Sequence, residues 1–391
     1  MKGRNLVLAL VTVAVLVAAW QVSEHKAPQT EITRSEFLPV LIERINDVTA
    51  LELRSAGHTT RLVRDGEAWH IAGKDDFPAD AGLVRRTLLQ LAALRGVEAK
   101  TSSPARYARL GVDDIEQDGA EGTRVEVFAG GDAPLVSLIV GHARAGGEPQ
   151  HYVRRSDEAQ SWLVEGALDV PADPIPWLDA GIVDIDTERV RSVRIAAPGA
   201  TPVVVAKDAP GDNFFVLQDV PEGFAPKSKA TVSSVGAVLL DLRLNDVAAA
   251  ARVAGQEPVR VTTVRTFDGL VVTLSDYTID DTTWTAFAFA YDPEGAVAPR
   301  PETTDEAVPT APLAAPKDAD DNAGGAPNDA ADAAPEKAAS ESVADEATRL
   351  AARTAGWVYV LPDYKRRMIE RDFDSLVEEK KAETPAADAA D

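Results

Sequence analysis

The sequence contains no cysteine among its 391 residues and only five histidines. Without thiols the chain forms no disulfide, no thiolate nucleophile, no cysteine-based zinc site and no lipid link through an N-terminal cysteine. Basic residues are also scarce, since 40 Lys and Arg against 63 Asp and Glu give a net charge of −23. Because nucleic-acid binding needs a basic surface, we expect no nucleic-acid partner.

The histidines show no metal-ligand spacing. His142 and His151 flank a glycine-rich turn and could approach each other across a hairpin, but exposed strand ends are the simpler interpretation. His25, His58 and His70 stand apart in the sequence. The sequence therefore predicts no histidine metal site and no metal cofactor.

Motifs for catalysis or phosphate binding are missing as well. The segment Gly141–Gly147 lacks the GxxxxGK[ST] and GxGxxG patterns, no GxSxG elbow occurs, and Ser228 has no partner pattern. Three carboxylate pairs could bind calcium or act as acid and base, but they lie in predicted turns, where aspartate hydrogen-bonds its own backbone. They are Asp75-Asp76, Asp113-Asp114 and Asp184 with Asp186. We predict no catalytic, cofactor-binding or metal-binding residue.

Aromatic residues make up only 6% of the chain. We interpret Trp69, Trp162, Trp177 and Trp357 as core residues, although an exposed tryptophan would indicate a binding surface. The basic run Lys365–Arg367 could contact lipid headgroups, but a solvated helix face is the simpler interpretation.

Long apolar runs are absent except at the N-terminus, where Leu6–Val22 follows Lys2 and Arg4. A helix of this length spans about 25 Å, the short end of what crosses a bilayer core of about 30 Å. A retained helix would form a single anchor with its basic end inside and Trp20 at the outer interface. Cleavage near Val17–Ala19 would instead make it a signal peptide. In both cases the remainder is exported.

The remainder begins with a predicted β-meander and one helix. Alternation predicts three strands, and a helix follows an Asp80 cap and ends at Gly96. The strands are Val48–Leu53, Thr60–Val63 and Ala68–Ile71, and the helix buries Val84, Leu88, Leu91 and Leu94. Antiparallel hairpin strands come next: Arg124–Phe128, Leu135–Val140, Gln150–Arg155 and Ser161–Glu165.

The pattern then recurs. A second meander and helix follow the proline-rich link Val170–Trp177, and Phe215 takes the place of Trp69 on the third strand. The repeated elements are Val190–Ile195, Pro202–Ala206, Asn213–Val216, and a helix with Val232, Val235, Leu239 and Leu242 on one face. The second hairpin run comprises Val259–Phe267, Leu270–Ser275, Trp284–Tyr291 and, far downstream, Gly356–Leu361.

An acidic insert, Asp292–Ala355, separates the last two strands of the second run. Residues 294–346 hold 13 acids and 3 bases, and such a composition favours disorder. We nevertheless expect Trp284–Tyr291 and Gly356–Leu361 to pair, because loop length costs little entropy. A terminal helix is predicted from Pro362, with Met368, Ile369, Phe373, Leu376 and Val377 on one face.

The predicted fold is α+β: two tandem repeats of a β-meander plus helix followed by antiparallel hairpin strands. The predicted segments are an anchor or signal at 1–22, a first repeat at 37–175, a second repeat at 176–377 with a disordered insert at 292–355, and a disordered tail at 378–391.

Seven motifs, in this order, carry a resemblance to a known family. They are Asn46-Asp-Val48, Asp65-Gly66 with Trp69, Phe77-Pro-Ala-Asp80, Arg106-Tyr-Ala-Arg-Leu-Gly111, Gln160-Ser-Trp-Leu-Val164, Asp169-Val-Pro-Ala-Asp173 with Trp177-Leu178, and Gly356-Trp-Val-Tyr359 with Pro362. Together they resemble the bacterial domain of unknown function 4340, from about Phe37 to Val377 without the insert. The resemblance implies a single pass through the inner membrane, a cytoplasmic N-terminus, a periplasmic body and an association with a gliding-motility-type ABC transporter. It supplies no catalytic residue.

Three functional hypotheses follow. The first is a non-catalytic, membrane-anchored accessory or scaffold protein of a cell-envelope complex, bound to the membrane through Leu6–Val22 and to protein partners. The second is a binding module for an envelope polymer or small ligand, which an exposed aromatic groove would favour. The third is a hydrolase with an unrecognised site, which convergent buried carboxylates or histidines would favour.

Overall fold

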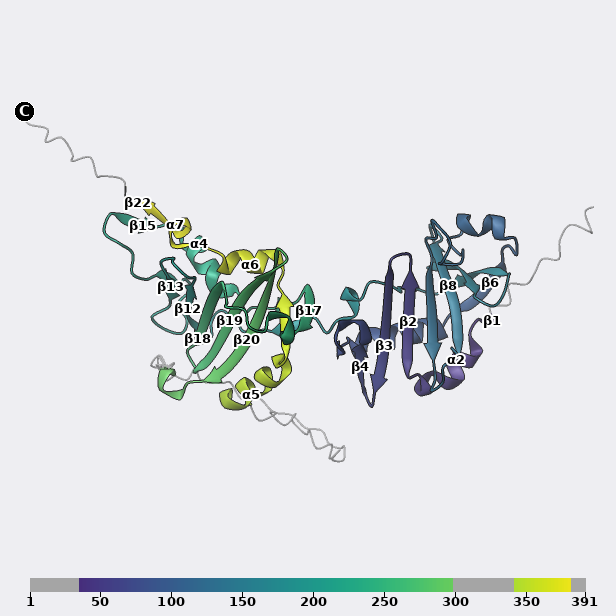
Figure 1. Ribbon diagram of the computed structural model, residues 1–391, viewed down its shortest axis with the longest axis horizontal. Helices are drawn as coiled ribbons and strands as arrows, with labels where there is room; N and C mark the ends of the chain where they lie inside the picture. The colour runs from purple at the N-terminus through teal and green to yellow at the C-terminus, as the bar shows by residue number, and fades with distance from the viewer. Residues whose placement is uncertain (1–34, 298–340, 381–391) are drawn as a thin grey trace, which may run out of the picture. The chain divides into compact units, whose positions relative to one another are not determined.

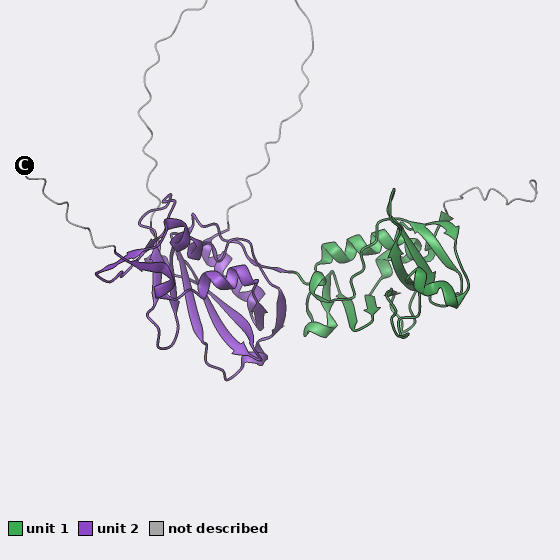
Figure 2. Ribbon diagram, turned by 90° about the horizontal axis from the view of Figure 1, so that it is seen from above, with its two compact units in different colours: residues 1–179 green, residues 180–391 purple. Residues whose placement is uncertain are grey.

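The computed structural model describes residues 35–297 and 341–380, in two compact units, residues 1–179 (unit 1) and 180–391 (unit 2) (Figures 1 and 2). Each unit is built on one large antiparallel sheet with a few short helices, so the chain has the expected α+β class. The predicted membrane segment Leu6–Val22 lies outside the described residues. No helix in the two described ranges is long and apolar enough to cross a membrane.

Unit 1 contains a ten-stranded sheet in the order β1-β6-β10-β9-β8-β7-β2-β3-β4-β5. Its strands are β1 (Ser35–Glu36), β2 (Ala50–Ser55), β3 (His58–Asp65), β4 (Ala68–Ile71), β5 (Phe77–Pro78), β6 (Arg95–Ala99), β7 (Thr123–Phe128), β8 (Val136–Ala143), β9 (Gln150–Arg155) and β10 (Ser161–Glu165). The helices are α2 (Pro39–Arg44) and α3 (Ala81–Ala92), with 3-10 turns η1 (Ile45–Asp47), η2 (Ala72–Lys74), η3 (Pro104–Arg109) and η4 (Ile175–Trp177).

Helix α3 begins where the sequence predicts. The Asp80 side chain accepts a hydrogen bond from the Leu83 N–H at 2.9 Å, which satisfies one of the free donors of the first turn. Residues spaced by three and four positions then form one buried face, comprising Val84, Thr87, Leu88 and Leu91. The opposite face, including Leu89, is exposed. The helix is therefore held by one apolar stripe.

Unit 2 contains an eight-stranded sheet in the order β14-β13-β12-β18-β19-β20-β21-β17. Its strands are β12 (Val190–Ala196), β13 (Val203–Ala206), β14 (Val216–Leu217), β17 (Asp246–Ala249), β18 (Arg260–Thr266), β19 (Leu270–Ile279), β20 (Thr282–Tyr291) and β21 (Trp357–Val360). Two small sheets pair β11 (Gly181–Val183) with β16 (Leu242–Arg243) and β15 (Phe224–Pro226) with β22 (Val377–Glu379). Helices α4 (Lys229–Ser233), α5 (Val343–Thr354), α6 (Asp363–Ile369) and α7 (Phe373–Leu376) complete the unit, with turns η5 (Ser234–Ala237), η6 (Ala250–Val253) and η7 (Pro293–Gly295).

The two large sheets share one strand order. The sequence of neighbours β4-β3-β2-β7-β8-β9-β10-β6 in unit 1 corresponds to β14-β13-β12-β18-β19-β20-β21-β17 in unit 2. One cross-strand row of buried residues matches position by position: Ile71, Leu62, Leu51, Val127 and Val136 against Leu217, Val205, Val193, Val264 and Val272. Trp69 lies two residues before Ile71 and Phe215 lies two residues before Leu217, so these two aromatic residues correspond as well.

The sequence predicts neither β6 nor β17, the strand that follows the helix region in each unit. Residue Gly96, expected to end the helix, lies inside β6 and pairs with Ser35, while α3 already ends at Ala92. These short strands show no clear apolar alternation, so periodicity does not reveal them. They form because pairing with β10 and β21 satisfies their backbone hydrogen-bonding groups.

The prediction of disorder throughout Asp292–Ala355 is wrong at both ends. The turn η7 follows Asp292, and α5 occupies residues 343–354. The Ser342 hydroxyl caps α5 by accepting from the Asp345 N–H, and Ala347, Leu350 and Thr354 are buried. The average composition of the insert hides this amphipathic segment. Residues 298–340 lie outside the described part of the chain.

The prediction of a single terminal helix from Pro362 is also wrong. The segment forms α6 and α7, because Asp372 caps a new turn by accepting from the Ser375 N–H at 2.9 Å. Strand β22 follows, and it includes Glu378 and Glu379 of the predicted disordered tail. The second repeat helix is likewise short: α4 gives way to η5, and the Lys365 amine donates to the carbonyl groups of Ala237 and Leu240 there.

The pairing across the insert is confirmed. Strands β20 and β21 are antiparallel neighbours, with Thr285 opposite Tyr359. The Phe287 and Tyr359 rings meet edge to face, with centroids 5.7 Å apart. This aromatic contact is of the kind expected from the alternation of the two strands.

Candidate functional site: clefts at corresponding strands

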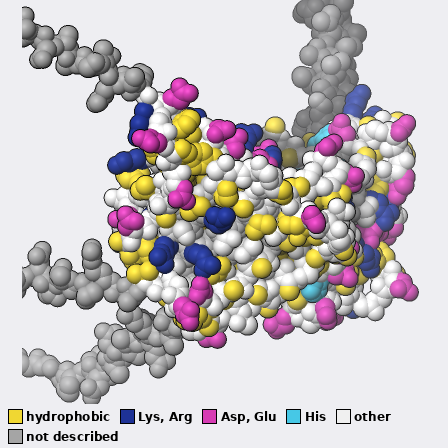
Figure 3. All heavy atoms as spheres, turned by 60° about the vertical axis from the view of Figure 1, so that its left-hand side comes forward, with side chains coloured by type: hydrophobic (Ala, Val, Ile, Leu, Met, Phe, Trp, Pro, Cys, Tyr) yellow, Lys and Arg dark blue, Asp and Glu magenta, His cyan; other side chains and the backbone are white. Residues whose placement is uncertain are grey.

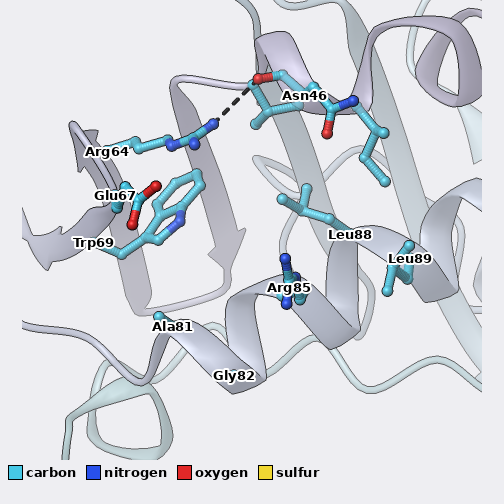
Figure 4. A pocket seen from close by; sticks show the side chains of 11 residues that line it. Asn46, Arg64, Glu67, Trp69, Ala81, Gly82, Arg85, Leu88 and Leu89 are labelled. Carbon is cyan, nitrogen blue, oxygen red and sulfur yellow. Dashed lines mark hydrogen bonds between the residues drawn. The ribbon is translucent and has the colours of Figure 1, made fainter.

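Unit 1 carries a cleft of about 550 Å³ between the β3–β4 hairpin and helix α3 (Figure 4). Figure 4 shows Arg64, Glu67 and Trp69 on the strand side and Arg85 and Leu89 on the helix side. The hairpin turn contains Gly66 at φ 60°, a backbone conformation that glycine adopts readily. We call this the unit 1 cleft; it is lined by Ile45, Asn46, Val48, Arg64, Glu67, Trp69, Ala81, Gly82, Arg85, Leu88 and Leu89.

The charged groups of the unit 1 cleft differ in how firmly they are held. Arg64 donates from Nε to the Gly66 carbonyl at 2.9 Å and from Nη1 to the Asn46 carbonyl at 3.1 Å. Within the described residues, no hydrogen bond or ion pair holds the side chains of Glu67 and Arg85. These two groups of opposite charge are therefore available to a ligand.

Unit 2 carries a cleft of about 580 Å³ beside β14, between that strand and the β15–α4 segment. We call it the unit 2 cleft; it is lined by Asp208, Asp212, Asn213, Phe214, Phe215, Val216, Leu217, Pro226, Lys227, Lys229 and Val232. Because β14 corresponds to β4 and the α4 segment follows as α3 does, the two clefts occupy corresponding places. The two clefts therefore match in their position on the sheet, but their lining side chains differ.

The unit 2 cleft is more apolar at its surface. Phe214 is 48% exposed and Val216 is 55% exposed, and the Lys229 amine lies 5.6 Å from the Phe214 ring centroid. Phe215 points inward and packs so closely on Gly236 that a Cβ at this glycine would overlap the ring. On the face drawn in Figure 3, hydrophobic side chains lie next to Lys and Arg side chains.

Several charged side chains that line the clefts are bound to backbone groups of their own unit. The Asp212 carboxylate accepts from the backbone N–H groups of Asp208 and Ala209, at 3.1 and 2.9 Å, so it stabilises its own loop. Lys227 donates to the Ser375 carbonyl at 2.9 Å. No cluster of three or more metal-ligating side chains occurs in the described ranges. Exposed apolar surface lies beside charged groups of both signs, namely Glu67 and Arg85 in the unit 1 cleft and Asp208 and Lys229 in the unit 2 cleft.

The structure does not bring the sequence-predicted titratable residues together into one site. The His142 Nε2 atom lies 2.7 Å from Glu121, while burial lowers the pKa of His151 on the neighbouring strand. His70 contacts the Asp76 carbonyl through Nδ1, and His58 is exposed at a turn. His25 lies outside the described residues.

Each carboxylate pair has a local structural role. Asp75 and Asp76 have positive φ values in a turn. Asp114 forms an ion pair with Arg154, whose side chain is 5% exposed. Asp184 and Asp186 accept backbone N–H groups of Asp241 and Glu188, at 2.7 and 2.8 Å.

The tryptophans and the basic run are placed as follows. Trp177 is fully buried and donates to the Pro171 carbonyl at 2.8 Å, and Trp69 is 8% exposed. Trp162 and Trp357 are half-buried. Lys365 is buried, so the expected solvated face of Lys365–Arg367 is wrong at its first residue.

Sequence reasoning missed the unit 2 cleft, although one signal was present. In Asn213-Phe-Phe-Val216 two phenylalanines are adjacent, and successive side chains of an extended strand point to opposite sides. One of them must therefore face away from the core. The exposed ring of Phe214 is the outcome.

The comparisons with known proteins bear on the family alone. The model of a family described as "Domain of unknown function (DUF4340)" matches residues 69–261, from the tryptophan of the unit 1 cleft to β18 of unit 2. No curated protein and no solved structure shows a significant match. Over these residues the chain matches the DUF4340 family, and the resemblance found in the sequence is confirmed.

Proposed function

We propose that this protein is a non-catalytic, membrane-anchored accessory or scaffold protein of a cell-envelope complex, which binds protein partners through its clefts. The observation that carries this proposal is the pair of clefts at corresponding strands of two sheets with one strand order. Exposed Leu89 and Phe214 supply apolar contact area, and Arg85 and Lys229 supply charge. Apolar anchors beside cations are typical of protein interfaces.

The tandem repeat belongs to the same proposal. The shared strand order and the matching row of buried residues support a duplicated unit that has diverged at its clefts. Anchoring through Leu6–Val22, a periplasmic body and an association with a gliding-motility-type ABC transporter are proposed from the sequence and from what the resemblance implies.

The test is purification of the full chain from its native membranes in a mild detergent. We expect a defined set of envelope proteins to co-purify with the wild type, and to be depleted by the double variant Arg85→Glu, Leu89→Asp. The control is Arg367→Glu, which makes the same charge reversal as Arg85→Glu at an exposed residue that lines neither cleft. Unchanged recovery with the cleft variant, or turnover of an envelope substrate by the purified protein, would contradict the proposal.

A small-ligand or envelope-polymer binding module is the second candidate. The unit 1 cleft favours it, because Glu67 and Arg85 present opposite charges beside Trp69. Isolated envelope glycan and peptide fragments should then change the tryptophan fluorescence in a saturable manner. Loss of that change in Trp69→Phe would assign it to this cleft.

A further inference from the structure

The outer edge of the sheet is closed in unit 1 and open in unit 2. In unit 1, β5 pairs with β4, and the Ala79 N–H donates to the Trp69 carbonyl at 2.7 Å. The segment at the corresponding place in unit 2 is β15, which precedes the helix as β5 does. It pairs with β22 instead, with Pro226 opposite Val377. In the described residues, β13 is therefore the only strand beside β14.

The outer side of β14 carries backbone hydrogen-bonding groups that pair with no second strand of the described chain, although Leu217 itself is only 4% exposed. The Gln218 N–H donates to the Val204 carbonyl at 2.8 Å, which sets the alternation of the antiparallel pair. By that alternation, the N–H and C=O of Leu217 point away from β13. No hydrogen bond within the described chain satisfies either group. An unpaired edge of this kind is a template for another strand.

The side chains beside this edge define what it would accept. Phe214 and Val216 are the exposed apolar groups, and Lys227 and Lys229 are the cations of the cleft. The Asp208 and Asp212 carboxylates line the cleft together with the two lysines, so its formal charges balance. Within the described residues no hydrogen bond or ion pair holds the Lys229 amine, which is therefore available to a carboxylate of an incoming segment that also carries an apolar anchor.

Unit 1 shows which chemistry covers the corresponding edge. The covering residues 75–80 read Asp-Asp-Phe-Pro-Ala-Asp, an acidic segment with one aromatic residue. Its Phe77 is only 5% exposed, so the aromatic side chain is the anchor of the pairing. The molecule thus contains its own example of an acidic, aromatic strand on this edge.

We infer that the unit 2 cleft and the β14 edge bind an extended, acidic segment with an aromatic anchor from a partner protein, by addition of a strand to the sheet. The backbone of Leu217 supplies the main-chain hydrogen bonds. By the unit 1 pairing of Phe77 with Ile71, the anchor lies opposite Leu217 and on the same face of the sheet. Phe214 and Val216 contact side chains on the other face of the added segment, and Lys229 attracts the carboxylates. This inference rests on the proposed function of binding protein partners.

The probe is a fluorescein-labelled peptide with the sequence of residues 73–80, titrated by anisotropy against the full chain in detergent. We expect saturable binding to the wild type and to the control Arg367→Glu. Lys229→Glu should weaken binding about two- to fivefold, the range of an exposed ion pair. A peptide with alanine in place of its phenylalanine should bind at least about tenfold more weakly. Bound peptide should also slow hydrogen exchange at Leu217.

Three outcomes would overturn the inference. The first is the absence of saturable binding. The second is binding that neither Lys229→Glu nor loss of the peptide aromatic weakens. The third is a dimer in sedimentation that Val216→Lys dissolves, since a second copy would then occupy the edge. The peptide test and the co-purification test can fail independently. If the peptide test fails while partners still co-purify from native membranes, the proposed function stands and only this inference is wrong.

Discussion

Unit 1 and unit 2 arrange their strands alike and complete the sheet edge differently. In unit 1 the segment before the helix folds back as β5 and covers β4. In unit 2 the C-terminal strand β22 binds the corresponding segment β15, and the cleft beside β14 is flanked by exposed Phe214 and Val216. A shared strand order therefore does not fix how an edge is protected, because the segment before the helix pairs with β4 in unit 1 and with β22 in unit 2.

The largest expected effect concerns the corresponding aromatic residues. Trp69→Ala and Phe215→Ala should each lower the free energy of unfolding by about 3–5 kcal/mol, because both side chains are buried in their units. The adjacent Phe214→Ala should cost less than about 1 kcal/mol, since its ring is 48% exposed. Urea unfolding followed by circular dichroism measures all three. If Phe214→Ala and Phe215→Ala lower the free energy of unfolding equally, then the assignment of Phe215 as the inward ring and Phe214 as the outward ring is wrong.

The second effect concerns the insert, which unit 1 lacks. Replacing residues 298–340 by a short Gly/Ser loop should leave the melting of unit 2 nearly unchanged, because a longer loop costs only a logarithmic entropy. Extending the deletion through α5 should destabilise unit 2 by about 2 kcal/mol or more, from the loss of buried Leu350 alone. The ion pair of Arg189 with Glu346, at 2.8 Å, is lost as well. Calorimetry with unit 1 as internal reference distinguishes the two deletions, and equal stability would contradict the docking of α5.

The smallest effect is a pH dependence of opposite sign in the two units. Burial opposes ionisation of Glu52 in unit 1, but hydrogen bonds from Arg61 and Arg54 outweigh it and lower the pKa. Burial raises the pKa of Asp276 in unit 2, against hydrogen bonds from Thr285 and Arg260. A lowered folded-state pKa gives stability that is present above the ordinary value near 4.5 and is lost as the pH falls. A raised folded-state pKa, as for Asp276, gives stability that is present when the pH is below the ordinary pKa near 3.8 and is lost as the pH rises.

The matched variants are Glu52→Gln and Asp276→Asn. The advantage of the wild type over Glu52→Gln should shrink as the pH falls below about 4.5. Its advantage over Asp276→Asn should shrink as the pH rises above about 4. Denaturant unfolding at a series of pH values measures both differences. Parallel pH profiles for the two variants would show that the two buried carboxyl groups do not have opposite environments.

Much of the fold could be predicted because it depends on local signals. The Asp65-Gly66 turn, the Asp80 cap and the alternation of β2 and β12 each specify structure within a few residues. The strands β6 and β17 and the choice of partner for β15 depend on residues far away in the chain. A short strand of mixed polarity carries no periodicity, so its pairing follows from the sheet that is already there.

The candidate site was less predictable than the fold. The sequence supplies no motif for either cleft, because a cleft is made by Arg64 from one element and Arg85 from another. The average composition of the insert hid helix α5, although its buried residues Ala347, Leu350 and Thr354 recur at helical spacing. The two adjacent phenylalanines of β14 were the one local sign of an exposed surface.

The measurement that tests the account most directly is hydrogen exchange of the backbone amides of Ile71 and Leu217 in the full chain. These residues occupy corresponding positions, and only Ile71 has a neighbouring strand on its outer side, where it pairs with Phe77. The account predicts that Leu217 exchanges at least about 100-fold faster than Ile71, because its amide has no partner in the described chain. Equal protection of the two amides would show that the β14 edge is already covered, and the contrast between a closed and an open edge would be wrong.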